Sequence, residues 1–281
     1  MDTIRTAKAM ADWSAAHQRE GITIGLVPTM GALHAGHRAL IRAARLSCDA
    51  VVVSLFVNPT QFGPKEDFSR YPRQLKADAA LCKKECVDVL FAPSTDEIYP
   101  DGFQTTVTVP GLARRWEGER RPGHFAGVAT VVTKLLAIVR PTAAFFGQKD
   151  FQQSALVTRL VADLNLGARV IVYPTVREAD GLALSSRNVY LTKDQRAAAP
   201  VLFQALKAGR TAIRDGIKAG TKIQQAMRDV MKQERLATID YLAVCDPETL
   251  EPLKQVRDRA VLLGAIRIGK IRLIDNLLVK V

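Results

Sequence analysis

The sequence lacks the features that mark secreted, membrane and disordered proteins. It has only four cysteines, at positions 48, 82, 86 and 245, and their spacing fits neither a disulfide framework nor a paired zinc site. Its longest apolar run, residues 50–57, contains Ser54 and falls far short of the ~20 residues of a membrane span. The first residues lack the apolar stretch of a signal peptide. We therefore expect a cytoplasmic protein in a reducing setting, with no membrane partner.

Aromatic residues and basic runs are also scarce. Aromatics make up 6% of the chain, and no five basic residues follow one another, although 40 Lys and Arg against 28 Asp and Glu give a net charge of +12. Nucleic-acid-binding modules typically show a basic stripe interleaved with aromatics, so we expect no nucleic-acid partner. The positive charge favours anionic metabolites instead. A nucleic-acid module stays an alternative, recognisable by an affinity that falls steeply with salt.

Hydrophobic patterning predicts a globular α/β fold. Apolar residues make up 48% of the chain and charged residues 24%, which is typical of a packed domain. Up to about residue 175, buried strands alternate with amphipathic helices, and this alternation is typical of parallel sheets. We expect helices at residues 3–20, 38–47, 73–85, 125–139 and 150–164. We expect strands at residues 22–27, 49–57, 87–91, 143–146 and 169–173, the first of them ended by Pro28.

Beyond residue 176 the pattern changes to helices followed by strands. We expect helices at residues 193–215 and 221–235, and antiparallel strands at residues 239–244, 260–266 and 271–279. The predicted architecture is thus a Rossmann-like parallel-sheet domain over residues 1–175 and a smaller C-terminal α+β lid domain over residues 176–281. Parallel sheets bind ligands at the carboxyl ends of their strands, so polar segments that follow strands are the candidate site.

Two of the four histidines fall in one short segment after the first of these strands. His34 and His37 lie three residues apart and so share one face of the first turn of a helix. A helix N-terminus attracts phosphate, and two imidazoles there could donate hydrogen bonds to a phosphate that gains charge during a reaction. Gly36 between them leaves room for a flat ring near the backbone. From these residues alone, two surface histidines or half of a metal site remain alternatives.

Four further polar segments follow strands or turns. Asn58 and Gln61 come after the second of these strands, where amides can bind a small hydroxy acid, although an ordinary Asn-Pro turn explains them better from the residues alone. Residues 121–124 form a Pro-Gly turn before an apolar helix. Residues 147–153 place Lys149 where it can meet phosphates, next to an aspartate that can cap a helix. Residues 184–187 offer two hydroxyls and an arginine that could clamp a triphosphate or cap a helix.

The run His34-Ala35-Gly36-His37 resembles the His-x-Gly-His signature of the nucleotidylyltransferase superfamily. Within that superfamily, five segments resemble the pantoate–β-alanine ligase family in the family's order: residues 28–37, 56–62, 121–128, 146–153 and 174–188. The likeness covers the chain from about residue 21 to residue 191. It implies ATP-dependent joining of (R)-pantoate and β-alanine to pantothenate through a pantoyl-adenylate, with release of AMP and pyrophosphate.

The resemblance also assigns roles to individual residues. His34 and His37 would stabilise the α-phosphate of ATP, and Lys149 and Arg187 the departing phosphates. The implied ATP contacts come from Pro28, Thr29, Met30, Gly31, His34, Gly36, His37, Gly147, Lys149, Asp150, Val176, Leu184, Ser185, Ser186 and Arg187. The implied contacts with pantoate or β-alanine come from Asn58, Gln61, Tyr71, Arg121, His124 and Gln153. Mg²⁺ would arrive with ATP, with Asp78 as a candidate ligand through water, and the enzyme would form a homodimer.

Two positions depart from the family pattern. The family usually has Glu where Gln148 stands, so this chain lacks a charge beside the nucleotide, and it often has Met where Leu184 stands. A different transferase of the superfamily, which makes a nucleotide-linked product, remains a rival interpretation. The central expectation is that the histidine pair and the loop of residues 184–187 converge on one bound triphosphate.

Overall fold

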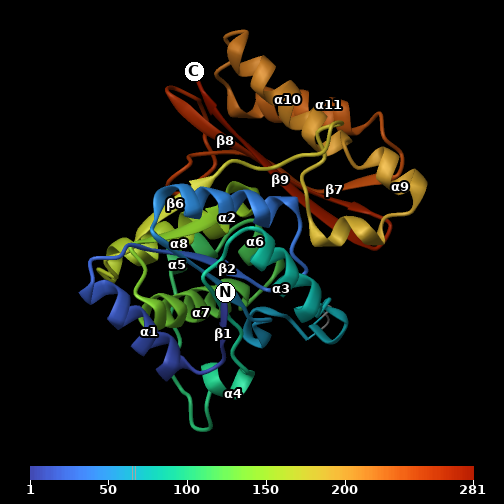
Figure 1. Ribbon diagram of the computed structural model, residues 1–281. Coiled ribbons are helices and arrows are strands. Elements are labelled where there is room, and N and C mark those ends of the chain that lie inside the picture. Colours follow the sequence, from blue (N-terminus) through green and yellow to red (C-terminus); the bar gives the residue numbers. More distant parts are fainter. Residues whose placement is uncertain (65, 67) are drawn as a thin grey trace. The chain divides into compact units, whose positions relative to one another are not determined.

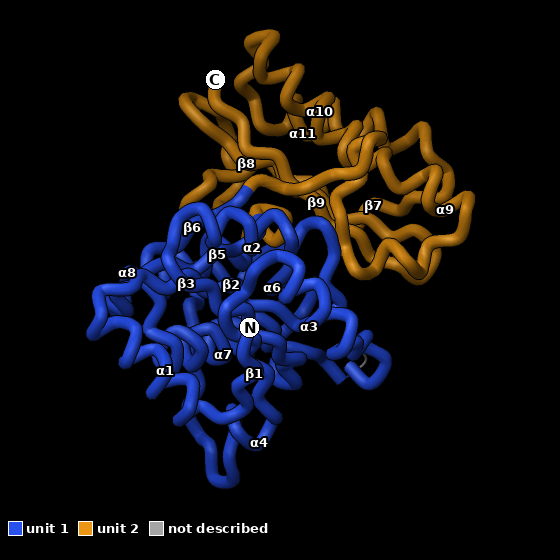
Figure 2. The backbone as a smooth tube through the Cα atoms, in the orientation of Figure 1, with its two compact units in different colours: residues 1–147, 153–173 blue, residues 148–152, 174–281 orange. Residues whose placement is uncertain are grey.

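The structure is a computed structural model that describes residues 1–64, 66 and 68–281. By their contacts these residues divide into two compact units, which Figure 2 colours separately. Unit 1 comprises residues 1–147 and 153–173, and unit 2 comprises residues 148–152 and 174–281. The segment 148–152 thus belongs to unit 2 although the sequence around it belongs to unit 1. The domain boundary predicted after residue 175 stays a prediction.

Unit 1 contains a six-stranded sheet in the order β1-β4-β3-β2-β5-β6 (Figure 1). All neighbouring strands run parallel, which confirms the predicted parallel sheet. The strands are β1 (Asp2–Ile4), β2 (Ile24–Thr29), β3 (Ala50–Leu55), β4 (Val89–Phe91), β5 (Ala143–Gly147) and β6 (Arg169–Tyr173). The chain moves from β2 to β3 on one side and places β5 on the other side of β2. Such a change of direction opens a crevice at the carboxyl ends of the strands, where α/β sheets bind ligands.

Helices cover the sheet of unit 1. Figure 1 shows α2 on one side of the strands and α1 with α7 on the other. The α-helices are α1 (Ala7–Arg19), α2 (Ala35–Ser47), α3 (Leu75–Lys84), α4 (Thr95–Ile98), α5 (Pro110–Ala113), α6 (Glu117–Arg120), α7 (His124–Val139) and α8 (Phe151–Asp163). Two short 3-10 turns of unit 1 are η1 (Pro59–Gln61) and η2 (Phe68–Arg70), whereas the turn η3 (Gln148–Asp150) belongs to unit 2. Leu40, Ile41 and Ala44 of α2 pack on valines of β2 and β3, as the helical period of the sequence predicted.

The N-terminal helix begins later than predicted. Residues 2–4 form β1, which pairs with Val89–Phe91, and the helix starts only at Ala7. Thr6 is its N-cap residue, and the Thr6 side chain accepts a hydrogen bond from Ala9 N at 3.3 Å. A three-residue strand has no periodicity of its own, so only its pairing partner distinguishes it from the first turn of a helix.

The prediction that Pro28 ends the strand was wrong. β2 continues to Thr29, and Pro28 lies opposite Ser54 of β3. In β2 the carbonyl of Ile24 faces β5, where it accepts a bond from Thr142 N, and that of Thr29 faces β3, where it accepts one from Phe56 N. Pro28 has the same orientation as Ile24, and pairing with β5 has already ended at Leu26. The missing N–H of proline therefore costs the sheet no hydrogen bond.

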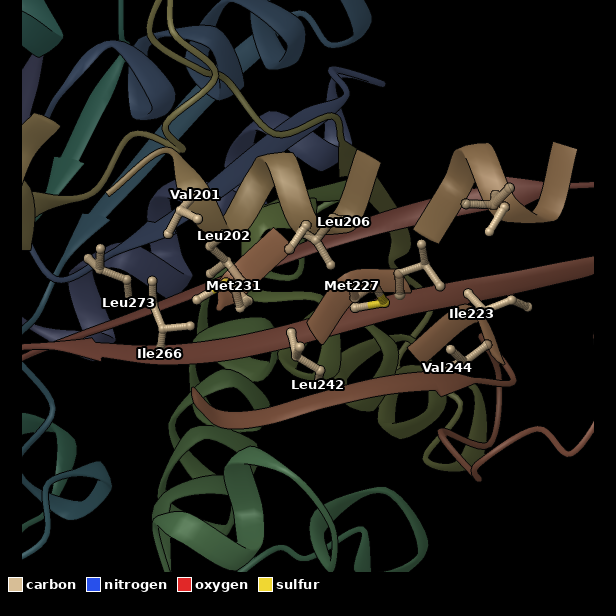
Figure 3. Close-up of a cluster of buried hydrophobic side chains, with 14 of the residues drawn as sticks. Val201, Leu202, Leu206, Ile223, Met227, Met231, Leu242, Val244, Ile266 and Leu273 are labelled. Atoms are coloured by element: carbon tan, nitrogen blue, oxygen red, sulfur yellow. The ribbon is translucent and has the colours of Figure 1, made fainter. Parts of the chain in front are cut away.

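Unit 2 is an α+β module, as predicted. A three-stranded antiparallel sheet contains β7 (Ala237–Cys245), β8 (Arg259–Ile268) and β9 (Ile271–Lys280) in that order. The helices are α9 (Lys193–Ala198), α10 (Val201–Arg214) and α11 (Gly220–Met231), and η4 (Ser186–Tyr190) is a 3-10 turn. The single helix predicted over residues 193–215 is broken at Pro200, which becomes the N-cap residue of α10. Apolar side chains of α10, α11 and the sheet form one core (Figure 3).

No helix among the described residues combines the length and the apolar character that a membrane crossing requires.

The four cysteines, all within the described residues, are free thiols of very different accessibility. Cys48, Cys82 and Cys245 are buried, whereas Cys86 is exposed. Burial, together with the negative charge of Asp78, raises the pKa of Cys82 to about 12, and burial raises the pKa of Cys48. Because the thiolate is the reacting species, a buried thiol of raised pKa is inert.

We expect a single fast-reacting thiol in the native protein. Titration with Ellman's reagent at pH 8 should modify Cys86 within minutes and the other three thiols only after addition of denaturant. Cys86→Ser should abolish the fast phase and leave three thiols in denaturant. Two or more fast thiols in the folded wild-type chain would contradict this assignment.

Candidate active site

The histidine segment forms the N-terminal end of α2. His34 is the N-cap residue, and its Nδ1 accepts a hydrogen bond from Gly36 N at 3.1 Å. His37 Nδ1 accepts one from His34 N at 3.3 Å. The two ring centroids are 4.2 Å apart, so the first turn of α2 carries both imidazoles side by side.

These hydrogen bonds determine which ring nitrogen carries the proton. A neutral imidazole has one donor nitrogen and one acceptor nitrogen. Because Nδ1 accepts in both rings, the proton of each neutral ring is on Nε2, which makes Nε2 the donor. The positive end of the α2 macrodipole lies at the same place. Both imidazoles can therefore donate to an anion without any change of protonation.

Gly36 makes room for a ring of the protein itself. A Cβ at position 36 would lie 2.9 Å from Cε1 and 3.0 Å from Nδ1 of His34. The flat ring that occupies the space beside Gly36 is thus the imidazole of His34. Any larger residue at this position would push that ring away from its cap on Gly36 N.

Asp78 of α3 holds the loop between β2 and α2. The residue is 3% exposed, and its carboxylate accepts hydrogen bonds from Ala32 N at 3.1 Å and Leu33 N at 2.8 Å. Gly31 (φ +87°) takes the left-handed backbone that glycine adopts without strain. Asp78 is therefore a positioning residue for the loop that leads into His34. Its contact with Mg²⁺ stays a prediction, and no group of three or more His, Cys, Asp or Glu suited to a metal occurs among the described residues.

The second group of predicted residues surrounds Gln61, at the end of η1. Asn58 is the N-cap residue of η1, is 1% exposed, and donates through Nδ2 to Gln61 Oε1 and to Gly127 O, both at 3.1 Å. Asn58 Oδ1 accepts from the Tyr99 hydroxyl at 2.9 Å. Gln61 Nε2 lies 3.1 Å from Met30 Sδ, beside the loop that follows β2. These contacts fix the Gln61 amide on the same side of unit 1 as the end of β2.

The turn before α7 supports the same glutamine from its backbone side. His124 Nδ1 lies 2.8 Å from Gln61 O, and His124 Nε2 lies 3.0 Å from Arg121 Nη1. Arg121 only donates, so His124 Nε2 accepts and His124 Nδ1–H donates to the Gln61 carbonyl. Arg121 also donates to both carboxylate oxygens of Glu66, at 2.7 and 2.6 Å. The predicted substrate residues Arg121 and His124 are thus assembled around Gln61.

Glu66 is the charged partner of this turn. Burial raises the pKa of its carboxyl, but the hydrogen bonds and charge of Arg121 outweigh burial and hold that pKa below its usual range. The pair therefore stays charged at neutral pH. The buried ring of Tyr71 packs edge-to-face with Phe62, the neighbour of Gln61, with the ring centroids 5.8 Å apart.

Within unit 2, Lys149 lies in the turn η3. Lys149 Nζ is 3.4 Å from Asp150 Oδ1. The backbone carbonyls of Gln148 and Lys149 both accept hydrogen bonds from Asn276 Nδ2, at 2.8 and 2.9 Å. Gln148 Nε2 in turn donates to Asn276 Oδ1 at 3.2 Å. A Glu carboxylate cannot donate this bond, so the departure from the family pattern at residue 148 has a structural counterpart on β9.

The loop with two hydroxyls and an arginine also lies in unit 2. Ser185 is the N-cap residue of η4, and its Oγ accepts from Arg187 N at 3.2 Å. Leu184 N donates to Val176 O at 3.0 Å, which ties the loop back to its own start. The hydroxyl of Ser185 can still donate its hydrogen to an anion. Convergence of this loop and the histidine pair on one triphosphate stays a prediction, because the two belong to different units.

Sequence reasoning missed four residues of these clusters. Tyr99, Glu66, Asp275 and Asn276 were not predicted, although each bonds a predicted segment. A signal existed for two of them, because Asp275 and Asn276 interrupt the otherwise apolar run of β9 and are 6% and 2% exposed. Buried polar neighbours of this kind need partners, and here the partners are loops.

Fold and site together define an α/β protein with a parallel sheet and a pair of histidines after its first long strand. A model of the family described as pantoate–β-alanine ligase matches residues 2–278. The pantothenate synthetases of Moorella thermoacetica and Heliobacterium modesticaldum are 49% and 50% identical over 281 residues, covering all of this chain and 99% and 100% of theirs. The chain therefore belongs to the pantoate–β-alanine ligase family.

Solved structures agree with this assignment. The pantothenate synthetase of Thermus thermophilus superposes with a TM-score of 0.93 at 48% identity and 99% coverage of both chains. The pantoate–β-alanine ligase of Francisella tularensis, solved with β-γ ATP and β-alanine, gives 0.81 at 36% identity, over 99% of this chain and 97% of that one. The chain is an ATP-dependent ligase that joins pantoate to β-alanine. The rival interpretation, a transferase with a nucleotide-linked product, is set aside by these matches.

Proposed function

We propose that this ligase works in two half-reactions and that residues of both units serve the first of them. In the first step a carboxylate oxygen of (R)-pantoate attacks the α-phosphorus of ATP, and the bond to the β-phosphate oxygen breaks to release pyrophosphate. In the second step the amine of β-alanine attacks the acyl carbon of pantoyl-adenylate. AMP leaves, the amine loses a proton, and the amide of pantothenate remains. No enzyme nucleophile is required.

His34 and His37 stabilise the α-phosphate during the first step. The observation that carries this role is the pair of Nδ1 acceptor bonds, which makes Nε2 a donor in both rings. Charge builds on the α-phosphate oxygens as the pantoate oxygen attacks. Donors already in place stabilise such a transition state without reorganisation. Pro28, Thr29, Met30, Gly31 and Gly36 supply the strand end and loop that hold the histidines.

Lys149, Ser185, Ser186 and Arg187 stabilise the departing pyrophosphate. Phosphoryl transfer depends chiefly on positioning and on neutralising charge, which suits a lysine point charge and a guanidinium. Mg²⁺ supplies further charge on the phosphates. It would arrive bound to ATP, because Mg²⁺ prefers phosphates and water to a cage of protein ligands. The remaining nucleotide contacts fall to Gly147, Asp150, Val176 and Leu184.

Pantoate binds against Gln61 and Gln153, with Asn58, Tyr71, Arg121 and His124 around them. Support comes from the hydrogen bonds that fix Gln61 on both its amide and its carbonyl side. An oriented amide can donate to the pantoate carboxylate and accept from its hydroxyls. Orientation matters here because a near-attack geometry contributes much of the rate of a reaction between two bound substrates.

Isotope exchange tests the order of the steps. With radiolabelled pyrophosphate and no β-alanine, exchange of label into ATP should require pantoate. Addition of β-alanine should then release AMP in step with pantothenate. Exchange without pantoate, or no exchange until β-alanine is present, would refute formation of the adenylate before amine attack.

Gln61→Ala should raise the KM for pantoate by roughly tenfold or more, because it removes oriented hydrogen bonds to a small charged ligand. Gln153→Ala should do the same, whereas the KM for ATP should change little in either variant. Steady-state kinetics with one substrate varied at a time measures both constants. A variant with normal pantoate saturation would remove that glutamine from the binding site.

We also propose a homodimer and a cytoplasmic location. β6 lies at the edge of the sheet, and none of its five residues is fully buried. Beside it, α2, β5 and β6 line a groove of about 510 Å³, with Leu46 89% exposed. A second copy related by two-fold symmetry would cover both the edge and the groove. The four free thiols suit a reducing compartment.

Sedimentation equilibrium tests the dimer. Wild type should sediment as a dimer at micromolar concentration, and Leu46→Glu should sediment as a monomer of unchanged thermal stability. Leu236→Glu, an equally drastic change at an exposed leucine of unit 2, should leave the mass unchanged. A monomeric wild type would overturn the proposal.

A further inference from the structure

Two buried polar residues in the middle of β9 bond the turn of Lys149 and the segment that leads to the Ser185–Arg187 loop. Asn276 bonds the turn that carries Lys149, and Asp275 bonds Arg177, which precedes the Ser185–Arg187 loop. Both are almost fully buried, at 2% and 6% exposure. Consecutive strand residues point to opposite faces, so β9 is covered on both sides at this position.

The side-chain amide of Asn276 makes three hydrogen bonds to one turn. Nδ2 donates to Gln148 O at 2.8 Å and to Lys149 O at 2.9 Å, which uses both amide hydrogens. Oδ1 accepts from Gln148 Nε2 at 3.2 Å. These three bonds all go to Gln148 and Lys149 of η3, which lie 128 and 127 residues away in the sequence. They therefore order the turn rather than β9 itself.

Asp275 holds the second segment through the side chain of Arg177. It accepts from Arg177 Nη1 at 2.6 Å and Nη2 at 2.9 Å, and from Asn276 N at 2.7 Å. Arg177 also donates to Gly181 O at 3.0 Å, and its guanidinium stacks 3.8 Å from the Phe203 ring centroid. Two residues of one strand thus clamp two loops of unit 2.

We propose that Asn276 is a positioning residue for adenylate formation, acting through the backbone of Gln148 and Lys149. This rests on the proposed role of Lys149 at the departing phosphates. A lysine ammonium sits on a long flexible stem. The backbone from which the stem starts therefore sets the region that the ammonium can reach. Fixing both carbonyls of the turn fixes that start. Displacement of a catalytic group by about 1 Å can cost ~10²-fold in rate.

Asn276→Asp is the variant that isolates this role. It keeps the size of the side chain but replaces the NH₂ donor by an acceptor that faces two carbonyl oxygens. We expect the kcat of pantoate-dependent pyrophosphate exchange to fall roughly 10- to 100-fold and the KM for ATP to rise, with the KM for pantoate unchanged. Val279→Ala, at an equally buried position of β9 (3% exposed), controls for lost stability and should leave all three constants unchanged.

A double-mutant cycle with Lys149→Ala separates this inference from the role on which it rests. If Asn276 acts through Lys149, adding Asn276→Asp to Lys149→Ala should lower the exchange rate less than twofold further. Full additivity of the two changes, or normal exchange in Asn276→Asp alone, would overturn the inference. Normal exchange in Lys149→Ala would instead refute the role of the lysine. If Asn276→Asp does not fold, Asn276→Ser, which keeps one donor, is judged by the same criteria.

Discussion

Replacing His37 by alanine should lower the kcat of pantoate-dependent pyrophosphate exchange by ~10²–10³. The His37 ring does two things that alanine cannot do. Its Nδ1 accepts the N–H of His34 at the start of α2, and its Nε2 is thereby the nitrogen that donates. Loss of the first bond should cost about 1 kcal/mol of stability, which a thermal melt would register as a small shift. The loss of rate should be far larger than this change in stability explains.

The variants His37→Gln and His37→Asn separate the effect of the His37 ring on rate from its effect on stability. Gln places an N–H donor near the position of His37 Nε2, whereas Asn places its polar atoms near that of Nδ1. We expect His37→Gln to retain more exchange activity than His37→Asn, and His37→Asn to retain more thermal stability. Unchanged exchange in His37→Ala, or the opposite order of the two amide variants, would show that the ring acts as a helix cap and not on the phosphate.

Gly127→Ala should impair pantoate binding and stability together. A Cβ at position 127 would lie 2.5 Å from Thr60 O and 2.6 Å from Gln61 N, and both of these atoms are backbone. The turn η1, which carries Gln61, would have to move away from α7, and this would break the 3.1 Å bond from Asn58 Nδ2 to Gly127 O. We expect a loss of about 1–3 kcal/mol in the free energy of unfolding and roughly a tenfold rise in the KM for pantoate.

Gly111→Ala provides the matched control. A Cβ at Gly111 would meet no heavy atom within 4 Å, so the same chemical change should leave the pantoate KM unaltered. Urea unfolding and steady-state kinetics on both variants measure the two effects. A normal pantoate KM in a destabilised Gly127→Ala variant would mean that the backbone of Gln61 does not set its affinity for substrate.

Much of unit 1 could be predicted because its strands and helices have strong local patterns. The valines of β3 and the apolar stripe of α2 are buried as their spacing predicts. The histidine segment lies between β2 and α2, where the sequence places it. The strand β1 could not be predicted, because three residues carry no period and only pairing with β4 makes them a strand. The effect of Pro28 was predicted wrongly because it depends on the neighbouring strand. Pairing with β5 ends at Leu26, so no strand lies opposite the nitrogen of Pro28.

The sequence by itself determined the alternation of the longer strands and helices, the family and the identity of the histidine pair, since these depend on residues close together in the chain. Only the tertiary structure decided how the site residues are held. Asp78 bonds backbone 45 and 46 residues away, His124 bonds Gln61 across 63 residues, and Asn276 bonds Lys149 across 127. Hydrogen bonds of this kind join groups that the folded core brings together, and no local pattern encodes them.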